Sequence, residues 1–229
     1  MTDRDIRSQS PALSERTSIV RVIEDAGAVA VIRLKDASQV PVVVDTLVAG
    51  GVRALEITMT IPRAIEVIRS IAGSLPEGVI LGAGTVLEAD TARRVIDAGA
   101  QFVVAPTLDA NTIAVCHDRQ VAVMPGCFSP TEIYRAWQLG ADVVKVFPAT
   151  SLGPGFIKDV RGPLPEIKLM PTGGVTPENA GDWIKAGAAA VGIGSSLVDA
   201  KAVAAGDFRR IEDAARLLIS NINAARAAL

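Results

Sequence analysis

Lys145 is the side chain in this sequence best suited to covalent chemistry. It stands in the run Val143-Val144-Lys145-Val146-Phe147-Pro148, and a strand there places Lys145 and Phe147 on one face and the two neighbouring valines on the other. If the valine face packs under helices, the lysine points into the interior, where a primary amine can attack a carbonyl carbon. The run by itself favours the other interpretation, a lysine at a strand edge that reaches water. The rest of the sequence must decide between the two.

Glu56 is the second candidate, in the run Ala54-Leu55-Glu56-Ile57-Thr58. Alternation puts it on one face with Ala54 and Thr58, and the leucine and isoleucine on the other. A carboxylate inside a strand needs either a partner or a function. It could form a buried salt bridge between two strands, or it could act as a general acid and base beside Lys145. The presence of Lys145 on another strand favours the second interpretation.

A repeated pattern predicts how these residues are positioned. Short apolar runs end at Gly or Pro and are followed by helical segments, with a spacing of about 20 to 27 residues that is typical of β-α units. Eight such units predict a (β/α)8 TIM barrel. A doubly wound sheet is the alternative, but Gly82-Ala83-Gly84 lacks the third glycine of a nucleotide-binding fingerprint. The predicted strands are residues 28–34, 52–58, 79–84, 101–106, 121–125, 142–147, 167–172 and 188–194.

The expected domain organisation is simple. Residues 1–14 are predicted to be a flexible N-terminal tail, and residues 15–229 a single barrel domain with an extra N-terminal helix over about residues 18–25. A long helix over about residues 207–228 is expected to end the chain.

The carboxyl ends of the predicted strands should hold the site, because active sites of such barrels lie there. Polar and glycine residues follow the seventh and eighth strands, where the fold commonly binds phosphate through backbone N–H groups. Glycines can also be simple turn residues, but two such loops in one barrel indicate a phosphorylated small molecule. The strand ends carry Arg33, Glu56, Thr85, Pro106, Lys145, Phe147, Gly173, Gly174 and Ser195.

Composition argues against several other classes of protein. The net charge of the 229 residues is -2, with both signs scattered, so no nucleic-acid surface is expected. Cys116, Cys127 and His117 form no pattern of metal ligands, so no metal is expected. The first 18 residues have no apolar core of a signal peptide, and no uninterrupted apolar run is long enough to span a membrane. A cytoplasmic enzyme without membrane contact is expected.

Five motifs follow one another between about residues 28 and 198: Gly50-Gly51-Val52 through Glu56-Ile57-Thr58, Gly82-Ala83-Gly84-Thr85-Val86, Lys145-Val146-Phe147-Pro148, Gly162-Pro163-Leu164-Pro165 and Pro171-Thr172-Gly173-Gly174-Val175. Taken in this order, they resemble the motifs of the 2-keto-3-deoxy-6-phosphogluconate (KDPG) and 4-hydroxy-2-oxoglutarate (KHG) aldolases. The resemblance implies a metal-independent class I aldolase without a cofactor, on a (β/α)8 barrel and assembled as a homotrimer.

The resemblance also implies a role for each site residue. Lys145 would form the Schiff base and Glu56 would be the general acid and base. The other residues would contact substrate: Thr85 and Pro106 at the pyruvate end, Phe147 beside the imine, and Gly173, Gly174 and Ser195 at the phosphate.

One position departs from the family pattern. Many members carry an arginine four residues after the catalytic glutamate, whereas this chain has Thr60 there. A cation for the substrate's carboxylate or phosphate must then come from elsewhere. Arg33, at the end of the first predicted strand, is the candidate.

The implied reaction is cleavage of KDPG to pyruvate and glyceraldehyde 3-phosphate. Cleavage of KHG, or of 2-keto-3-deoxy-6-phosphogalactonate, is the nearest alternative, and activity without a phosphate on the substrate would favour KHG. A phosphosugar isomerase or epimerase would leave Lys145 unmodified by pyruvate. A non-catalytic sugar-phosphate binder would turn nothing over, which the pairing of Lys145 with Glu56 argues against. The fold alone decides none of these.

Overall fold

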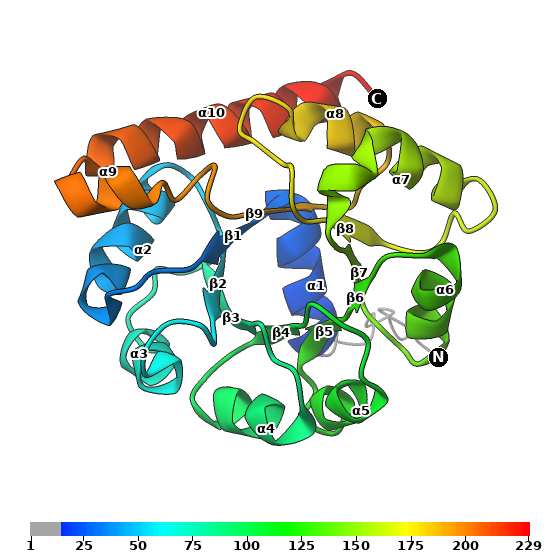
Figure 1. Ribbon diagram of the computed structural model, residues 1–229, viewed down its shortest axis with the longest axis horizontal. Coiled ribbons are helices and arrows are strands. Elements are labelled where there is room, and N and C mark those ends of the chain that lie inside the picture. Colours follow the sequence, from blue (N-terminus) through cyan, green and yellow to red (C-terminus); the bar gives the residue numbers. More distant parts are fainter. Residues whose placement is uncertain (1–14) are drawn as a thin grey trace, which may run out of the picture.

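Within residues 15–229, which the computed structural model describes, nine short parallel strands alternate with helices and curl round a common axis (Figure 1). The expected tail, residues 1–14, lies outside the described residues, so its boundary stays a prediction. The strands are β1 (Ala28–Ile32), β2 (Ala54–Thr58), β3 (Ile80–Gly84), β4 (Phe102–Val104), β5 (Ala122–Met124), β6 (Gly126–Cys127), β7 (Val144–Val146), β8 (Leu169–Pro171) and β9 (Val191–Ile193).

The nine strands form a closed wall of eight, because β5 and β6 together take the place of the fifth strand. Six strands pair in the order β5-β4-β3-β2-β1-β9, and the other three in the order β6-β7-β8. Pro125, which has no N–H, separates β5 from β6, so that β5 pairs with β4 while β6 pairs with β7. A bridge between Thr172 and Gly192 joins β8 to β9. The predicted (β/α)8 architecture is confirmed, with its fifth strand interrupted at Pro125.

The helices after β1 surround this wall, while α1 lies behind it in Figure 1. None of the helices between residues 15 and 229 has both the length and the apolar character to cross a membrane. They are α1 (Glu15–Ala26), α2 (Val40–Ala49), α3 (Ala64–Ile71), α4 (Ala89–Asp97), α5 (Ala110–Asp118), α6 (Pro130–Gln138), α7 (Gly153–Arg161), α8 (Ala180–Lys185), α9 (Ala200–Ala205) and α10 (Phe208–Ala227), with 3-10 turns η1 (Ala37–Gln39) and η2 (Ala149–Ser151).

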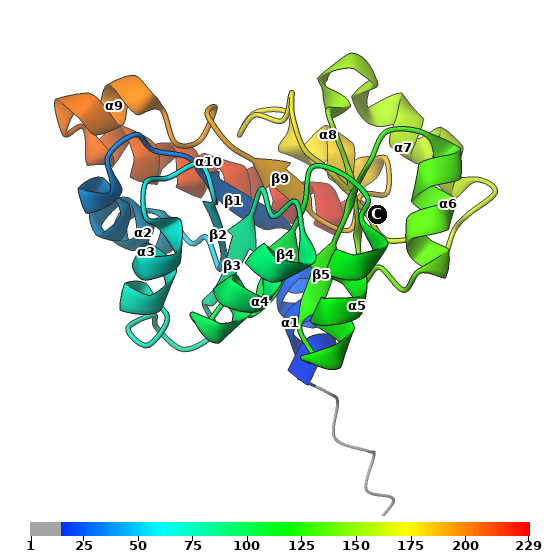
Figure 2. The ribbon, with the colours of Figure 1, turned by 60° about the horizontal axis from the view of Figure 1, so that its bottom comes forward.

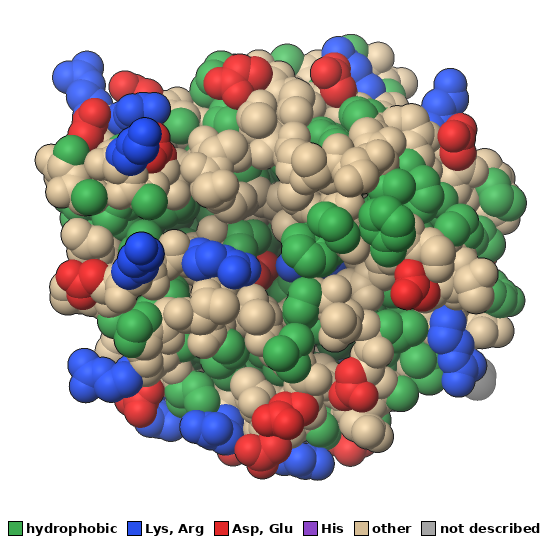
Figure 3. Space-filling view, viewed as in Figure 1, with side chains coloured by type: hydrophobic (Ala, Val, Ile, Leu, Met, Phe, Trp, Pro, Cys, Tyr) green, Lys and Arg blue, Asp and Glu red, His purple; other side chains and the backbone are tan. Residues whose placement is uncertain are grey.

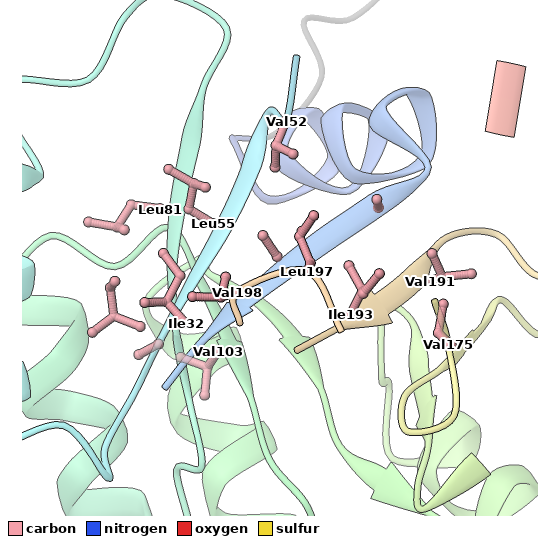
Figure 4. Close-up of a cluster of buried hydrophobic side chains, with 14 of the residues drawn as sticks. Ile32, Val52, Leu55, Leu81, Val103, Val175, Val191, Ile193, Leu197 and Val198 are labelled. Carbon is pink, nitrogen blue, oxygen red and sulfur yellow. The ribbon is translucent and has the colours of Figure 1, made fainter. Parts of the chain in front are cut away.

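Outward-facing strand residues form the larger apolar core, between the wall and the helices. Ile32, Leu55 and Leu81 belong to it and are almost fully buried (Figure 4). Val144 and Val146 of β7 are also fully buried in this layer. The valine face of the lysine-bearing strand therefore packs outward, as the alternation predicts, and Lys145 faces inward.

A second, smaller core fills the amino-terminal end of the barrel. Helix α1 lies across that end, seen behind the strands in Figure 1 and below them in Figure 2. Its residues Ile19, Val20 and Ile23 pack against inward-facing residues of the wall, such as Phe102 and Met124. The predicted N-terminal helix is therefore present, and it closes one end of the barrel so that only the carboxyl end is open.

Local capping sets several of the helix starts. Asp109 accepts a hydrogen bond from the backbone N–H of Thr112 at the start of α5. Ser129 and Glu132 form a reciprocal capping box at the start of α6. Asp36 caps η1 and accepts hydrogen bonds from the backbone N–H and the hydroxyl of Ser38.

Candidate active site

Lys145 lies inside the barrel on β7. Only 5% of it is exposed, and it pairs in register with Gly126 on β6 and Met170 on β8. Its Nζ lies 5.0 Å from the centroid of the Phe147 ring, over the ring face. The shared face predicted for these two residues is therefore confirmed, and the amine is buried inside the barrel.

Glu56, on β2, is buried in the same interior and is 1% exposed. Neither carboxylate oxygen has a hydrogen-bond partner among the described residues. Burial raises the pKa of Glu56 above its ordinary value, and the charges of Lys145 and Arg33 oppose that rise without cancelling it. A carboxyl group with a raised pKa gives up its proton less readily than a free carboxyl group, which suits a group that must donate a proton as well as accept one.

Thr85 and Pro106 lie at the ends of the adjacent strands. Thr85 directly follows Gly84, which contacts the Glu56 carboxylate, and its φ of 59° is rare for a β-branched residue. Such strain is typical of functional sites. Pro106 packs against Gly126, where an added Cβ would lie 2.3 Å from its carbonyl carbon and oxygen. Since Gly126 pairs with Lys145, both predicted residues border the interior that holds Lys145 and Glu56.

A cavity of about 420 Å³ opens beside this pair at the carboxyl end of the strands. Figure 3 looks onto that end and shows a hollow in which basic side chains flank an acidic one. The cavity brings together five of the predicted substrate-binding residues, whereas Thr85, Pro106, Glu56 and Lys145 are not part of its lining. The five are Arg33, Phe147, Gly173, Gly174 and Ser195.

Free backbone donors line one side of the cavity. Among the described residues, no backbone hydrogen bond is donated by the amides of Gly173, Gly174, Ser195 or Ser196. Gly173 and Gly174 have φ values of 95° and 75°, in the left-handed region that favours glycine. Successive free amides in such a turn form a concave site for an anion.

Two side-chain contacts hold these loops in place. Ser196 donates through Oγ to the carbonyl of Val175, 2.6 Å away, and so joins the loop after β9 to the loop after β8. Asn179 donates to the carbonyl of Gly174 at 2.9 Å and accepts from the backbone N–H of Thr176. The carbonyls of Gly174 and Val175 are thereby occupied within the loops, while the amides of the two glycines and of Ser195 and Ser196 stay free.

Thr172 is a further site residue, to which the sequence predictions assigned no role. It is 7% exposed, lines the cavity, and its Oγ1 has no hydrogen-bond partner among residues 15–229. Alternation along β8 could have found it, because Met170, two residues earlier, faces into the barrel opposite Lys145. A buried hydroxyl without a partner is suited to bind a polar group of a ligand.

The cysteines and the histidine lie outside this constellation. Burial, with a smaller effect of Glu132, raises the pKa of the Cys127 thiol to about 12. Burial likewise raises the pKa of Cys116 to about 12, so neither thiol is activated as a nucleophile. His117 makes a structural contact, with Nε2 2.9 Å from the carbonyl oxygen of Gly140. In the described part of the chain, no three His, Cys, Asp or Glu side chains gather as metal ligands do.

Comparison with known proteins gives a consistent result. Residues 19–214 match the family model described as KDPG and KHG aldolase. A KHG/KDPG aldolase of Escherichia coli (strain K12) is 34% identical over 202 residues, which cover 88% of this chain and 94% of that protein. A 2-dehydro-3-deoxy-6-phosphogalactonate aldolase of the same organism is 35% identical over 67% of this chain and 76% of its own.

A solved structure extends the likeness to the fold and the chemistry. The KDPG aldolase of Legionella pneumophila, captured with pyruvate as a covalent carbinolamine intermediate, superposes with a TM-score of 0.80 at 26% identity. The match covers 87% of this chain and 97% of that one. The barrel, the buried lysine and glutamate, and these comparisons agree that this chain belongs to the KDPG and KHG aldolase family of class I aldolases.

Proposed function

We propose that this aldolase cleaves KDPG to pyruvate and glyceraldehyde 3-phosphate through an imine on Lys145. The observation that carries the proposal is the burial of Lys145 together with Glu56 inside the barrel, next to a cavity lined by free backbone amides. The amine and the carboxyl supply the covalent chemistry, and the amides supply an anion site.

Lys145 acts as the nucleophile. Its neutral amine attacks the C2 ketone of the substrate and forms a carbinolamine, and loss of water then gives a protonated imine. When the C3–C4 bond breaks, its electron pair moves to the imine and forms an enamine. Protonation of the enamine at C3 and hydrolysis of the resulting imine release pyruvate and restore the lysine. The carbinolamine captured in the Legionella relative supports this sequence of steps.

Glu56 moves the protons. As a carboxylic acid it donates a proton to the carbinolamine hydroxyl, which leaves as water. As a carboxylate it then accepts the proton of the C4 hydroxyl while the C3–C4 bond breaks, which releases the aldehyde. Support comes from its raised pKa, since burial favours the protonated form that must donate in the first of these steps.

The remaining residues hold the substrate between two ends. Thr85 and Pro106 border the pyruvate end, and Phe147 packs beside the imine. At the other end, the amides of Gly173, Gly174 and Ser195 hold the phosphate. Arg33, which lines the same cavity, supplies the cation for the anionic substrate that Thr60 cannot supply.

The substrate is tested by a lyase assay coupled to pyruvate reduction, with KDPG, its galactonate epimer and KHG compared under one set of conditions. We expect the highest kcat/KM for KDPG. Preference for the epimer would assign the galactonate reaction, for which a 35% identical relative is named. Equal activity on KHG, which has no phosphate, would contradict a role of the glycine amides in selecting the substrate.

The role of Arg33 is tested in the same assay. Arg33→Leu should raise KM for KDPG, and Arg33→Lys should restore part of the loss, because a cation is retained without the planar guanidinium. Arg53 directly precedes β2, at the amino end of the strand, and donates to the carbonyl of Gly78. Its substitution by leucine is the control and should leave KM unchanged. An unchanged KM in Arg33→Leu would show that another group binds the anion.

We also propose that the chain assembles as a homotrimer and works in the cytoplasm. Phe128 and Tyr134 are 43% and 46% exposed, and large exposed aromatic side chains are frequent in interfaces between subunits. Sedimentation equilibrium of the full chain should give three times the chain mass of 23.8 kDa. A monomer at micromolar concentration would contradict the assembly.

A further inference from the structure

The inward face of β3 carries glycine at two successive positions, and a side chain from a neighbouring strand fills each space. A Cβ added at Gly82 would lie 2.2 Å from the ring of Phe102 on β4. A Cβ added at Gly84 would lie 1.7 Å from Oε1 of Glu56, 2.3 Å from its Cδ and 2.6 Å from its Cγ. The carboxyl group of Glu56 therefore lies against the bare backbone of Gly84.

No hydrogen bond from the described part of the chain orients that carboxyl group. A general base is usually oriented by a third group that hydrogen-bonds to it, as in catalytic triads. Both oxygens of Glu56 are buried, and neither has a hydrogen-bond partner within residues 15–229. The position of the carboxyl group is therefore set by packing and by the charges of Lys145 and Arg33.

We propose that Gly84 is a positioning residue of this aldolase: its missing side chain creates the space in which the Glu56 carboxyl group is held within the barrel beside Lys145. The proposal deepens the proposed function, because it rests on Glu56 being the acid and base of the aldol cleavage. Gly84 itself contributes no functional group to the reaction. It acts only through the placement of Glu56.

Backbone pairing on both sides of β3 prevents the strand from moving away to make room for a side chain at Gly84. β3 is paired with β2 on one side, where Gly84 lies opposite Thr58, and with β4 on the other. The carbonyl of Gly84 also accepts a hydrogen bond of 2.8 Å from the backbone N–H of Met59. Gly84 does not have the left-handed φ that disfavours alanine. The backbone can therefore accommodate an alanine, and the carboxyl group is the part that must move.

Gly84→Ala tests the proposal, with Gly82→Ala as the matched control on the same face of the same strand. We expect kcat for KDPG cleavage to fall about 10²-fold in Gly84→Ala, the effect of misplacing a catalytic group by about 1 Å, with KM almost unchanged. The pH profile of kcat should also shift, because the moved carboxyl group has new surroundings. Gly82→Ala displaces Phe102 instead, and should lower the melting temperature while keeping kcat and the pH profile.

Rescue separates positioning from a general loss of structure. Glu56→Asp shortens the side chain by one methylene, which draws the carboxyl group away from position 84. We expect the Gly84→Ala/Glu56→Asp double variant to be more active than Gly84→Ala, although Glu56→Asp alone is less active than wild type. If Gly84→Ala does not fold, the double variant is compared with Glu56→Asp, and the added alanine should then have little effect on kcat.

Two outcomes would overturn the proposal. One is a Gly84→Ala enzyme with wild-type kcat and pH profile, and the other is a double variant whose losses simply add. Failure of the proposed function is recognised separately, because the wild-type protein would then not cleave KDPG or form a reducible adduct with pyruvate.

Discussion

The two ends of the barrel differ in whether their polar side chains have hydrogen-bond or ion-pair partners. At the amino end, Arg16 pairs with Asp142 at 2.8 Å and Lys168 with Glu24 at 2.8 Å. Arg226 donates to the carbonyl of Asp25 near the end of α1. At the carboxyl end, both oxygens of Glu56 and the hydroxyl of Thr172 are buried without partners; they are three of the four such atoms found among the described residues. These polar groups at the amino end have partners, whereas those at the carboxyl end have none among the described residues.

This difference indicates that the amino end stabilises the fold, whereas the carboxyl end carries the reactive groups. Helix α1 and the inward residues beneath it exclude water and form a closed apolar core. At the mouth, an unpaired carboxyl group and a buried lysine are unfavourable for folding, but they are ready to bind and react. Substitutions at the two ends should therefore separate activity from stability.

The largest effect is expected from Lys145→Ala. Without the amine no imine forms, and the chain has no other described group placed to take up the electrons of the C3–C4 bond. We expect no detectable cleavage of KDPG in the coupled assay, and a circular dichroism spectrum like that of wild type. Measurable turnover by the folded variant would show that Lys145 is not the nucleophile.

Glu56→Gln should retain the fold and lower kcat by about 10²–10⁴-fold, the usual contribution of general acid–base catalysis. The amide fills the same space but cannot shuttle protons. Stopped assays at high enzyme concentration will measure the residual rate. Wild-type kcat in this variant would remove Glu56 from the mechanism.

The same variant should show a pH-dependent gain in stability relative to wild type. Because the folded-state pKa of Glu56 is raised above 4.5, the native protein keeps this proton to higher pH than the unfolded chain does. Above that value, the free energy of unfolding of wild type falls as pH rises through the folded pKa. Glutamine has no such titration. The melting temperature of Glu56→Gln minus that of wild type should therefore increase with pH across this window, and a constant difference would contradict the raised pKa.

At the closed end, Ile23→Ala should affect stability alone. Ile23 is fully buried between α1 and the barrel wall, and removal of such a side chain lowers the free energy of unfolding by about 2–5 kcal/mol. Urea unfolding will measure the loss, and kcat of the folded protein should stay at the wild-type value. A large fall in kcat without loss of stability would show that the two ends are not separate.

The smallest effect is expected from Lys168→Met, which removes the ion pair with Glu24. Both side chains are about one-third exposed, so the loss of stability should be about 0.2–1 kcal/mol and should shrink with added salt. A loss that is larger and independent of salt would indicate a packing role for the lysine stem.

The strand pattern predicted much of the fold and of the site. Alternation placed Lys145 and Glu56 inward, and the glycines after the seventh and eighth strands indicated the anion site. The interruption of the fifth strand at Pro125 and the strained φ of Thr85 depend on pairing with neighbouring strands, which periodicity does not contain. The contact of Glu56 with Gly84 was likewise hidden, because it joins side chain and backbone across two strands.

The imine on Lys145 is the central claim, and trapping it tests that claim most directly. The protein is incubated with pyruvate and sodium borohydride, and its intact mass and peptide map are recorded. A single reduced pyruvate adduct on Lys145 is the predicted result, and it should be absent in Lys145→Ala. A well-folded wild-type protein without an adduct, or with the adduct on another lysine, would contradict the account.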